Sequence, residues 1–144
     1  MSPVFDEQQP AHQKALGKLA NDLILWFGSV RADGRPHSVP VWFLGHDGQA
    51  LIFSEAKTQK IRNVRRDQRV VLSLETEGTG ADVVILDGNA ELSSENASAW
   101  LPRIGEAYTR KYAEGLKGIG LTVDQMALQY DQVIVVTPTR LTAW

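Results

Sequence analysis

The sequence predicts a mainly β protein: an antiparallel barrel of about six strands with a few short helices packed outside it. Four of the strand candidates are nearly continuous in apolar residues, which is typical of strands buried on both faces. Two Asp-Gly pairs, Asp33-Gly34 and Asp47-Gly48, join such segments through turns too short for a parallel crossover. Antiparallel strands buried on both faces favour closure into a barrel.

The composition limits the classes of protein that fit. A chain of 144 residues is expected to form one domain, residues 1–144. The absence of cysteine excludes disulfides, zinc–thiolate sites and thiol catalysis. A net charge of −2 argues against a nucleic-acid partner, and no apolar run approaches the ~20 residues that cross a bilayer. The first residues lack a secretory signal pattern, so we expect a cytoplasmic protein.

The first half of the chain predicts a helix and three strands. Apolar residues three and four apart predict an amphipathic helix over residues 8–20. Strands over residues 23–30, 36–44 and 50–54 follow, joined by the Asp-Gly turns into an antiparallel meander. Pro40 lies inside the second strand, where it cannot donate a hydrogen bond. It marks either an edge strand or a gap in the pairing, against which a flat ligand could lie.

The second half predicts a basic helix, further strands and short helices. Gly88 indicates a bulge. Ser94 can cap one helix, and Thr122 with Gln125 forms a capping-box pattern for another. The expected elements after the basic segment are strands over 70–74 and 82–92, a helix beginning after 94, a short helix ending near 130, a strand over 133–136, a turn at Pro138, and a strand over 141–144.

The basic segment is the candidate binding site. Residues 57–69 hold six of the fifteen Lys and Arg residues and one acid, Asp67. This concentrated positive charge suits a small polyanion, because fixed cations and helix N-terminal amides favour phosphate or carboxylate oxygens. Helical spacing directs a set of polar residues toward a ligand beside Ser54: Lys57, Thr58, Lys60 and Arg65. A solvated charged face is the alternative interpretation.

Motifs for metal binding or direct catalysis are missing. His12, His37 and His46 have no metal-ligand spacing, so no metal site is expected. There is no Gly-x-Ser-x-Gly motif, and the link around Gly78 and Gly80 does not fit a phosphate-binding loop. No catalytic residue is therefore assigned. If the protein is an enzyme, a bound cofactor supplies the reactivity.

Three segments carry a resemblance to a known family: residues 36–43, 52–64 and 137–144. With them the chain resembles the pyridoxamine-phosphate-oxidase-like, flavin-binding split-barrel superfamily, and most resembles its branch of deazaflavin (coenzyme F420) dependent reductases. The resemblance implies a six-stranded antiparallel split β-barrel with short flanking helices. It also implies a homodimer with the cofactor at the subunit interface. The family's substrate-phosphate residues near the C-terminus have no match here, so oxidation of vitamin B6 is not expected.

The function implied is an oxidoreductase that transfers a hydride between reduced F420 and a small unsaturated or quinone-like substrate. FMN is the alternative cofactor, and a non-catalytic carrier of a flavin or tetrapyrrole is the alternative function. The ribityl chain and phosphate would be held by Ser54, Lys57, Thr58 and Lys60. The ring would be lined by Val39, Pro40, Val41 and Trp42. Arg140 and Trp144 are further candidates, contributed by the partner subunit.

Overall fold

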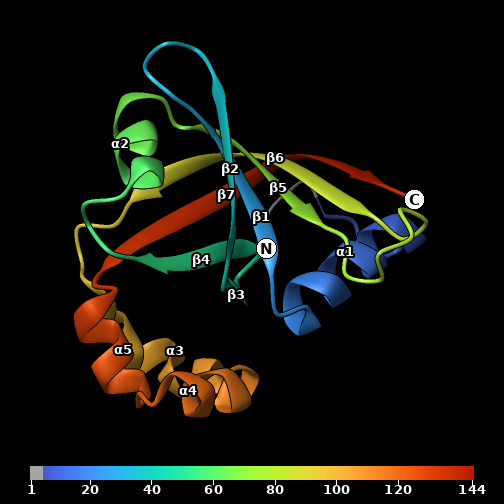
Figure 1. Ribbon diagram of the computed structural model, residues 1–144. Helices are drawn as coiled ribbons and strands as arrows, with labels where there is room; N and C mark the ends of the chain where they lie inside the picture. Colours follow the sequence, from blue (N-terminus) through green and yellow to red (C-terminus); the bar gives the residue numbers. More distant parts are fainter. Residues whose placement is uncertain (1–4) are drawn as a thin grey trace.

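The computed structural model describes residues 5–144 and shows one antiparallel sheet curled into a half-barrel (Figure 1). The order of its seven strands is β2-β1-β5-β6-β7-β4-β3. The elements are α1 (Pro10–Asn21), β1 (Leu25–Val30), β2 (Pro36–Val41), β3 (Leu44–His46), β4 (Gln49–Ser54), α2 (Gln59–Arg66), β5 (Arg69–Leu74), β6 (Val84–Leu92), α3 (Ala97–Lys111), α4 (Ala113–Ile119), α5 (Val123–Gln129) and β7 (Gln132–Ala143). The predicted split-barrel class, mainly β with flanking helices, is confirmed, but the described residues form seven strands and not the expected six. Among residues 5–144, no helix is long and apolar enough to cross a membrane.

Both Asp-Gly turns are confirmed. Gly34 closes the β1–β2 hairpin with φ of 88°, and the Arg31 N–H donates to the Arg35 carbonyl across the turn. Asp47 and Gly48 join β3 to β4 with φ of 51° and 75°. Two successive residues with positive φ give the turn whose twist matches that of the flanking strands.

The predicted strand over residues 36–44 is wrong, because it is two strands at opposite edges of the sheet. β2 pairs with β1, whereas β3 pairs with β4, so the expected three-strand meander does not form. The chain crosses between the two edges at Trp42 and Phe43. Side chains at the end of α3 satisfy the peptide groups there: the Tyr112 hydroxyl accepts from the Phe43 N–H at 2.8 Å, and Lys111 Nζ donates to the Phe43 carbonyl at 2.9 Å. These contacts replace the ladder bonds that a continuous strand would make.

The Lys111 ammonium at this crossing is expected to make the free energy of unfolding depend on pH. It lies 3.6 Å from the centre of the Phe43 ring, and burial lowers the pKa of Lys111 to about 8, with Asp22 acting in the opposite direction. Between about pH 8 and the ordinary lysine value of ~10.4, the unfolded chain therefore binds more protons at this site than the folded chain. The Lys111 contribution to the free energy of unfolding should rise with pH over this window.

Urea unfolding of the wild type and Lys111→Met between pH 7 and 10 measures this contribution. The free energy of unfolding of the wild type should increase relative to that of the variant as the pH rises. Lys117→Met is the control, because it removes an exposed lysine from α4 and so shows how the loss of a surface positive charge alone changes the free energy of unfolding. A difference that stays level or falls with pH would contradict the expectation.

The bulge at Gly88 is confirmed, whereas the predicted turn at Pro138 is wrong. β7 continues through Pro138 as one strand, and the β6–β7 register shifts between Asp87 and Gly88. A Cβ on Gly88 would lie 2.8 Å from the Thr137 carbonyl oxygen, so only glycine allows the two backbones to approach this closely. The shift accommodates the proline without ending the strand.

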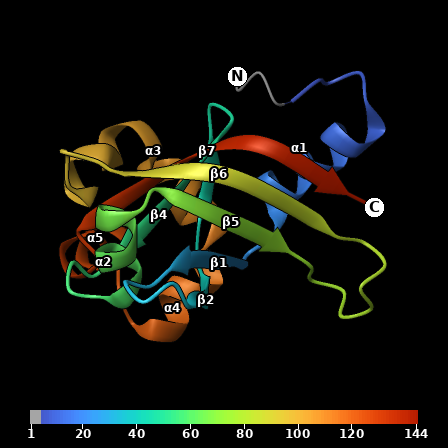
Figure 2. The ribbon, with the colours of Figure 1, turned by 90° about the horizontal axis from the view of Figure 1, so that it is seen from above.

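Two apolar clusters hold the helices on the sheet. The inner cluster fills the concave side, and α1 and α2 join it through Leu19 and Ile61. The outer cluster lies between the other face of β4 and β7 and the helices α3–α5, where Phe53 and Val133 meet Tyr108. Figure 2 shows β5 and β6 side by side, with α1 and α3 at opposite ends of the sheet. That residues 1–144 form a single domain stays a prediction.

The capping patterns in the sequence predict some of the helix ends correctly and one of them wrongly. α1 is within two residues of the predicted range. The capping box at Thr122 and Gln125 is confirmed, with both reciprocal hydrogen bonds present. The cap of α3 is Asn96 and not Ser94, because the Asn96 side chain accepts from the Ala99 N–H at 2.9 Å.

Candidate functional site

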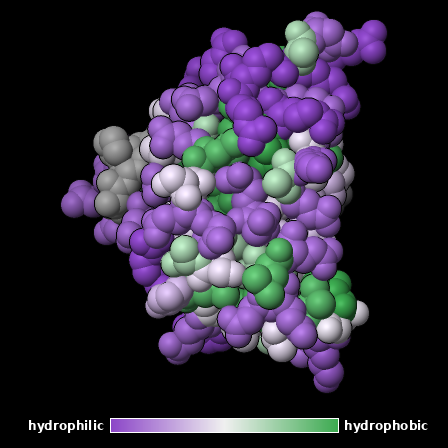
Figure 3. Space-filling view, turned by 90° about the vertical axis from the view of Figure 1, so that its left-hand side faces the viewer, coloured by the Kyte–Doolittle hydropathy of each residue, from purple (hydrophilic) through white to green (hydrophobic). Residues whose placement is uncertain are grey.

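A pocket of about 430 Å³ lies where β2, β4 and the start of α2 face the helices α3–α5. This volume is within the range of small-molecule sites, roughly 300–1,000 Å³. Figure 3 views the side of the molecule that carries α2 and α5, where hydrophilic surface surrounds patches of apolar surface. The residues that line the pocket are Pro40, Val41, Trp42, Phe53, Ser54, Glu55, Thr58, Lys60, Tyr108, Ile119, Met126 and Tyr130.

The polar end of the pocket is formed where β4 turns into α2. The buried Ser54 hydroxyl donates to the Glu55 carbonyl at 2.9 Å and lies 3.2 Å from the Thr58 hydroxyl. Thr58 is the N-cap residue of α2, yet its side chain makes no capping hydrogen bond. The first N–H groups of the helix therefore have no side-chain acceptor. Such a helix start, with its partial positive charge, is suited to an anion.

Lys60 adds a cation in the first turn of α2. Its side chain is partly buried in the pocket lining, and burial lowers the pKa of Lys60, with Glu55 acting in the opposite direction. Within residues 5–144 the Lys60 ammonium makes no ion pair and no hydrogen bond to a side chain or carbonyl. A partly desolvated cation without a partner is unfavourable, so a bound anion would relieve this cost.

A buried polar network fixes α2 against β1. Asn63 is fully buried and donates to the Ser29 hydroxyl at 3.0 Å, while it accepts from the Gln59 amide at 2.7 Å. Arg66 donates to the Val30 carbonyl at the other end of the helix. These bonds satisfy buried groups that would otherwise be costly, and they hold the start of α2 at the pocket. The sequence analysis missed Asn63, because its partner lies 34 residues earlier in the chain.

An aromatic wall forms the opposite side of the pocket. Trp42 stacks on Tyr112, with ring centres 4.6 Å apart and an angle of 7° between the planes. Tyr108 stacks on Phe53 at 5.0 Å and 5°, and it also contacts Tyr112. Tyr108 and Tyr112 are four residues apart on α3, so one helix face supplies both. This spacing was the available signal for two residues that the sequence analysis missed.

The pocket brings together six of the eleven residues expected from the sequence: Pro40, Val41, Trp42, Ser54, Thr58 and Lys60. Val39 neighbours them on β2 but packs against the inner cluster. Lys57 and Arg65 are exposed and lie outside the pocket lining.

The two C-terminal candidates lie farther along β7. Arg140 pairs with Asp87 of β6, beyond the bulge. Trp144 bonds to Val83 through the backbone, and its indole N–H donates to the Gly80 carbonyl at 2.9 Å. Neither residue lines the pocket. A role for them in a partner's site stays a prediction.

His37 is a further polar residue near the cationic end. Among the residues described, its Nδ1 is buried without a hydrogen-bond partner. Burial, and then the charges of Arg31 and Lys60, lower the pKa of His37. The imidazole is therefore neutral at pH 7 and adds no positive charge to this end of the molecule.

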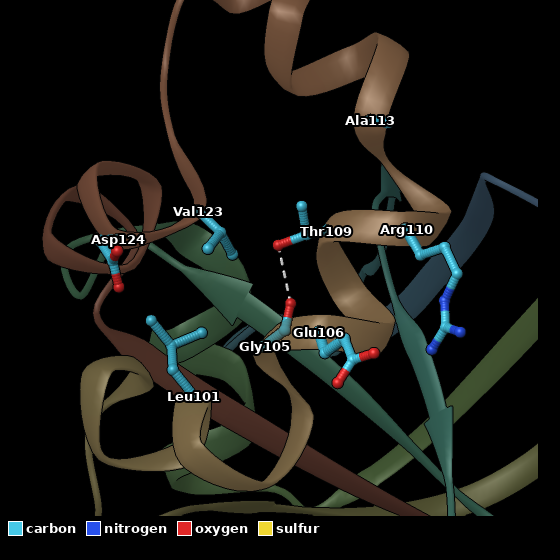
Figure 4. A pocket seen from close by; sticks show the side chains of 8 residues that line it. All are labelled: Leu101, Gly105, Glu106, Thr109, Arg110, Ala113, Val123 and Asp124. Atoms are coloured by element: carbon cyan, nitrogen blue, oxygen red, sulfur yellow. Dashed lines mark hydrogen bonds between the residues drawn. The ribbon is translucent and has the colours of Figure 1, made fainter.

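A larger groove of about 610 Å³ runs along α3, α4 and α5 (Figure 4). The Thr109 hydroxyl donates to the Gly105 carbonyl at 2.7 Å, so its hydrogen is already used. The groove is lined by residues from α3 to α5 alone and contains none of the residues expected from the sequence. The smaller pocket is therefore the better candidate site.

The curled antiparallel sheet with its flanking helices defines a split-barrel protein. The chain belongs to the pyridoxamine 5'-phosphate oxidase family, whose model matches residues 11–144. A comparison with curated proteins finds no match.

Structures with the same fold have been solved for proteins of different kinds. A conserved hypothetical protein of Mycobacterium tuberculosis is 25% identical, with a TM-score of 0.74 over 100% of this chain and 88% of that one. An F420 reductase is 19% identical, with a TM-score of 0.63 over 88% and 94% of the two chains. A haem storage protein of Vibrio cholerae is 16% identical, with a TM-score of 0.64 over 94% and 95%.

Proposed function

We propose that the pocket binds the phosphorylated side chain and ring of a redox cofactor, coenzyme F420 or alternatively FMN. The observation that carries this proposal is the partly buried Lys60 ammonium, which makes no ion pair or hydrogen bond among the described residues, beside the uncapped start of α2. The residues present fit such a group: cation and hydroxyls at one end suit a phosphate, and the apolar edge of β2 with the aromatic wall suits a flat ring. Lys57 and Arg65, exposed on either side of Lys60, would add a longer-range attraction.

In this function the protein is an oxidoreductase, and the cofactor, when bound, supplies the hydride for a small unsaturated or quinone-like substrate. The chain's own contribution is binding, orientation and exclusion of water. Lys60 and the α2 amides fix the anionic end. Trp42 and the β2 edge at Pro40 and Val41 restrict the plane of the ring.

Titration of the purified protein with F420 and with FMN, followed by absorption and fluorescence, tests the proposal. Saturable binding of either cofactor is expected, and oxidation of the reduced cofactor should follow when enones or quinones are added. Absence of binding by both cofactors would rule out the proposed site.

A non-catalytic carrier is the second candidate, since the haem storage protein shows that this fold also serves storage. A carrier would bind flavin or tetrapyrrole tightly without turnover. Binding of a cofactor with no oxidation on a panel of enones, quinones and biliverdin would therefore favour the carrier over the oxidoreductase.

We also propose a homodimer with the cofactor at the subunit interface, in the cytoplasm. β2 is an edge strand, and its Pro40 pairs with Trp26 of β1, a tryptophan that is 48% exposed. An exposed aromatic residue beside an edge strand next to the pocket suits contact with a second copy. Such a contact is where Arg140 and Trp144 of a partner would reach the cofactor.

A further inference from the structure

The hydroxyl of Tyr108 has no hydrogen-bond partner among the described residues. The residue is 1% exposed, and its ring is held between Phe53 and Tyr112. Among residues 5–144 no atom accepts from or donates to this hydroxyl, whereas the Tyr112 hydroxyl contacts both Phe43 and Leu23. A buried tyrosine hydroxyl usually has a partner, since leaving it without one is unfavourable.

The Tyr108 hydroxyl faces the pocket and not the closed core. Tyr108 is one of the pocket's lining residues. Within the described residues, the Tyr108 hydroxyl oxygen is not one of the side-chain atoms that are sealed from solvent and lack a hydrogen-bond partner. The space it reaches is therefore the pocket, where a bound molecule can supply the missing partner.

The hydroxyl can act as a donor but not as an acid. Burial, and then the neighbouring Tyr112, raise the pKa of Tyr108 well above its ordinary value. The proton therefore stays on the oxygen throughout the physiological range, because a buried phenolate would be poorly solvated. A neutral O–H in a fixed orientation is suited to a carbonyl oxygen or a ring nitrogen.

We propose that Tyr108 is a positioning residue whose O–H donates a hydrogen bond to an acceptor atom of the ring bound in this pocket. The inference rests on the proposed function. It adds a second fixed point, on α3, to the anion-holding corner on α2. Two fixed points on different elements define the orientation of a ring, whereas the corner alone holds only its tail.

The test compares FMN with riboflavin, which has the same ring without the phosphate. Tyr108→Phe should weaken the binding of both ligands by a similar factor, about 5- to 20-fold. Tyr108→Phe should also shift the absorption band of the bound ring, because the hydrogen bond to the ring is lost. A general packing defect that weakened both ligands equally would not shift this band. Thr109→Val is the matched control: it removes a hydroxyl from the neighbouring residue of α3, but Thr109 lies in the larger groove and not in the pocket lining, so the affinities for both ligands and the absorption band should stay as in the wild type.

Two further variants separate this inference from the proposed function. Tyr112→Phe removes the hydroxyl that accepts from the Phe43 N–H and donates to the Leu23 or Phe43 carbonyl, so it should unfold earlier than the wild type, whereas Tyr108→Phe removes no such bond and should not. If Tyr108→Phe binds both ligands as tightly as the wild type while Lys60→Ala weakens FMN, the inference fails and the proposed function stands. If the wild type binds neither FMN, riboflavin nor F420, both fail together.

Discussion

Replacing Lys60 by alanine is expected to weaken the binding of FMN and F420 by about 10- to 100-fold. A charge-assisted hydrogen bond to a phosphate contributes about 1.5–3 kcal/mol, which corresponds to this loss of affinity. Lys60 is a partly buried cation of the pocket lining, and among the residues described it makes no ion pair and no hydrogen bond, although the Glu55 charge acts on it. Fluorescence titration at fixed ionic strength measures the effect, since the attraction of more distant cations depends on salt.

Arg62→Ala is the matched control on the same helix. It removes one positive charge from α2, but Arg62 is exposed and donates to Gln59 at 2.9 Å, and neither residue lines the pocket. Its affinity should stay within about twofold of the wild type, as expected for an exposed charge. Riboflavin binding should be unaffected by Lys60→Ala, because riboflavin lacks the phosphate. Equal FMN affinities in Lys60→Ala and Arg62→Ala would place the anion site elsewhere.

The features that sequence reasoning predicted correctly depend on neighbouring residues. The Asp33-Gly34 and Asp47-Gly48 turns need backbone conformations with positive φ, which glycine adopts readily. The Gly88 bulge and the Thr122 capping box are likewise local. Ser54, Thr58 and Lys60 were expected to lie together because they fall within seven residues, where a strand ends and a helix begins, and they do line one pocket; their role in binding stays a prediction.

The features that sequence reasoning missed depend on contacts between distant segments. The break at Trp42 and Phe43 has no local signal, since Tyr112 satisfies the Phe43 peptide groups from 69 residues away. The turn expected at Pro138 is absent because Gly88, on another strand, accommodates the proline. Tyr108 could be assigned to an apolar helix face, but not to the pocket, because the packing of α3 on β4 decides which part of that face meets Phe53.

Alanine at Gly115 is expected to disturb the aromatic wall and with it the pocket. A Cβ at this position of α4 would lie 2.8 Å from two ring atoms of Trp42. Trp42 is stacked on Tyr112, which leaves its ring little room to move away without opening the wall. Overpacking of this kind costs about 1–3 kcal/mol, so Gly115→Ala should lower the free energy of unfolding despite the better helix propensity of alanine.

Gly118→Ala provides the comparison within the same helix. A Cβ at Gly118 meets nothing within 4 Å, so only the change in helix propensity remains, and this variant should gain about 0.5–1 kcal/mol. Urea unfolding should therefore separate the two variants in opposite directions from the wild type. Because Trp42 lines the pocket, Gly115→Ala should also weaken cofactor binding, whereas Gly118→Ala should not. If both variants gained stability and bound cofactor like the wild type, Trp42 would not be fixed by its contact with α4, and the rigid wall that orients the ring would have to be abandoned.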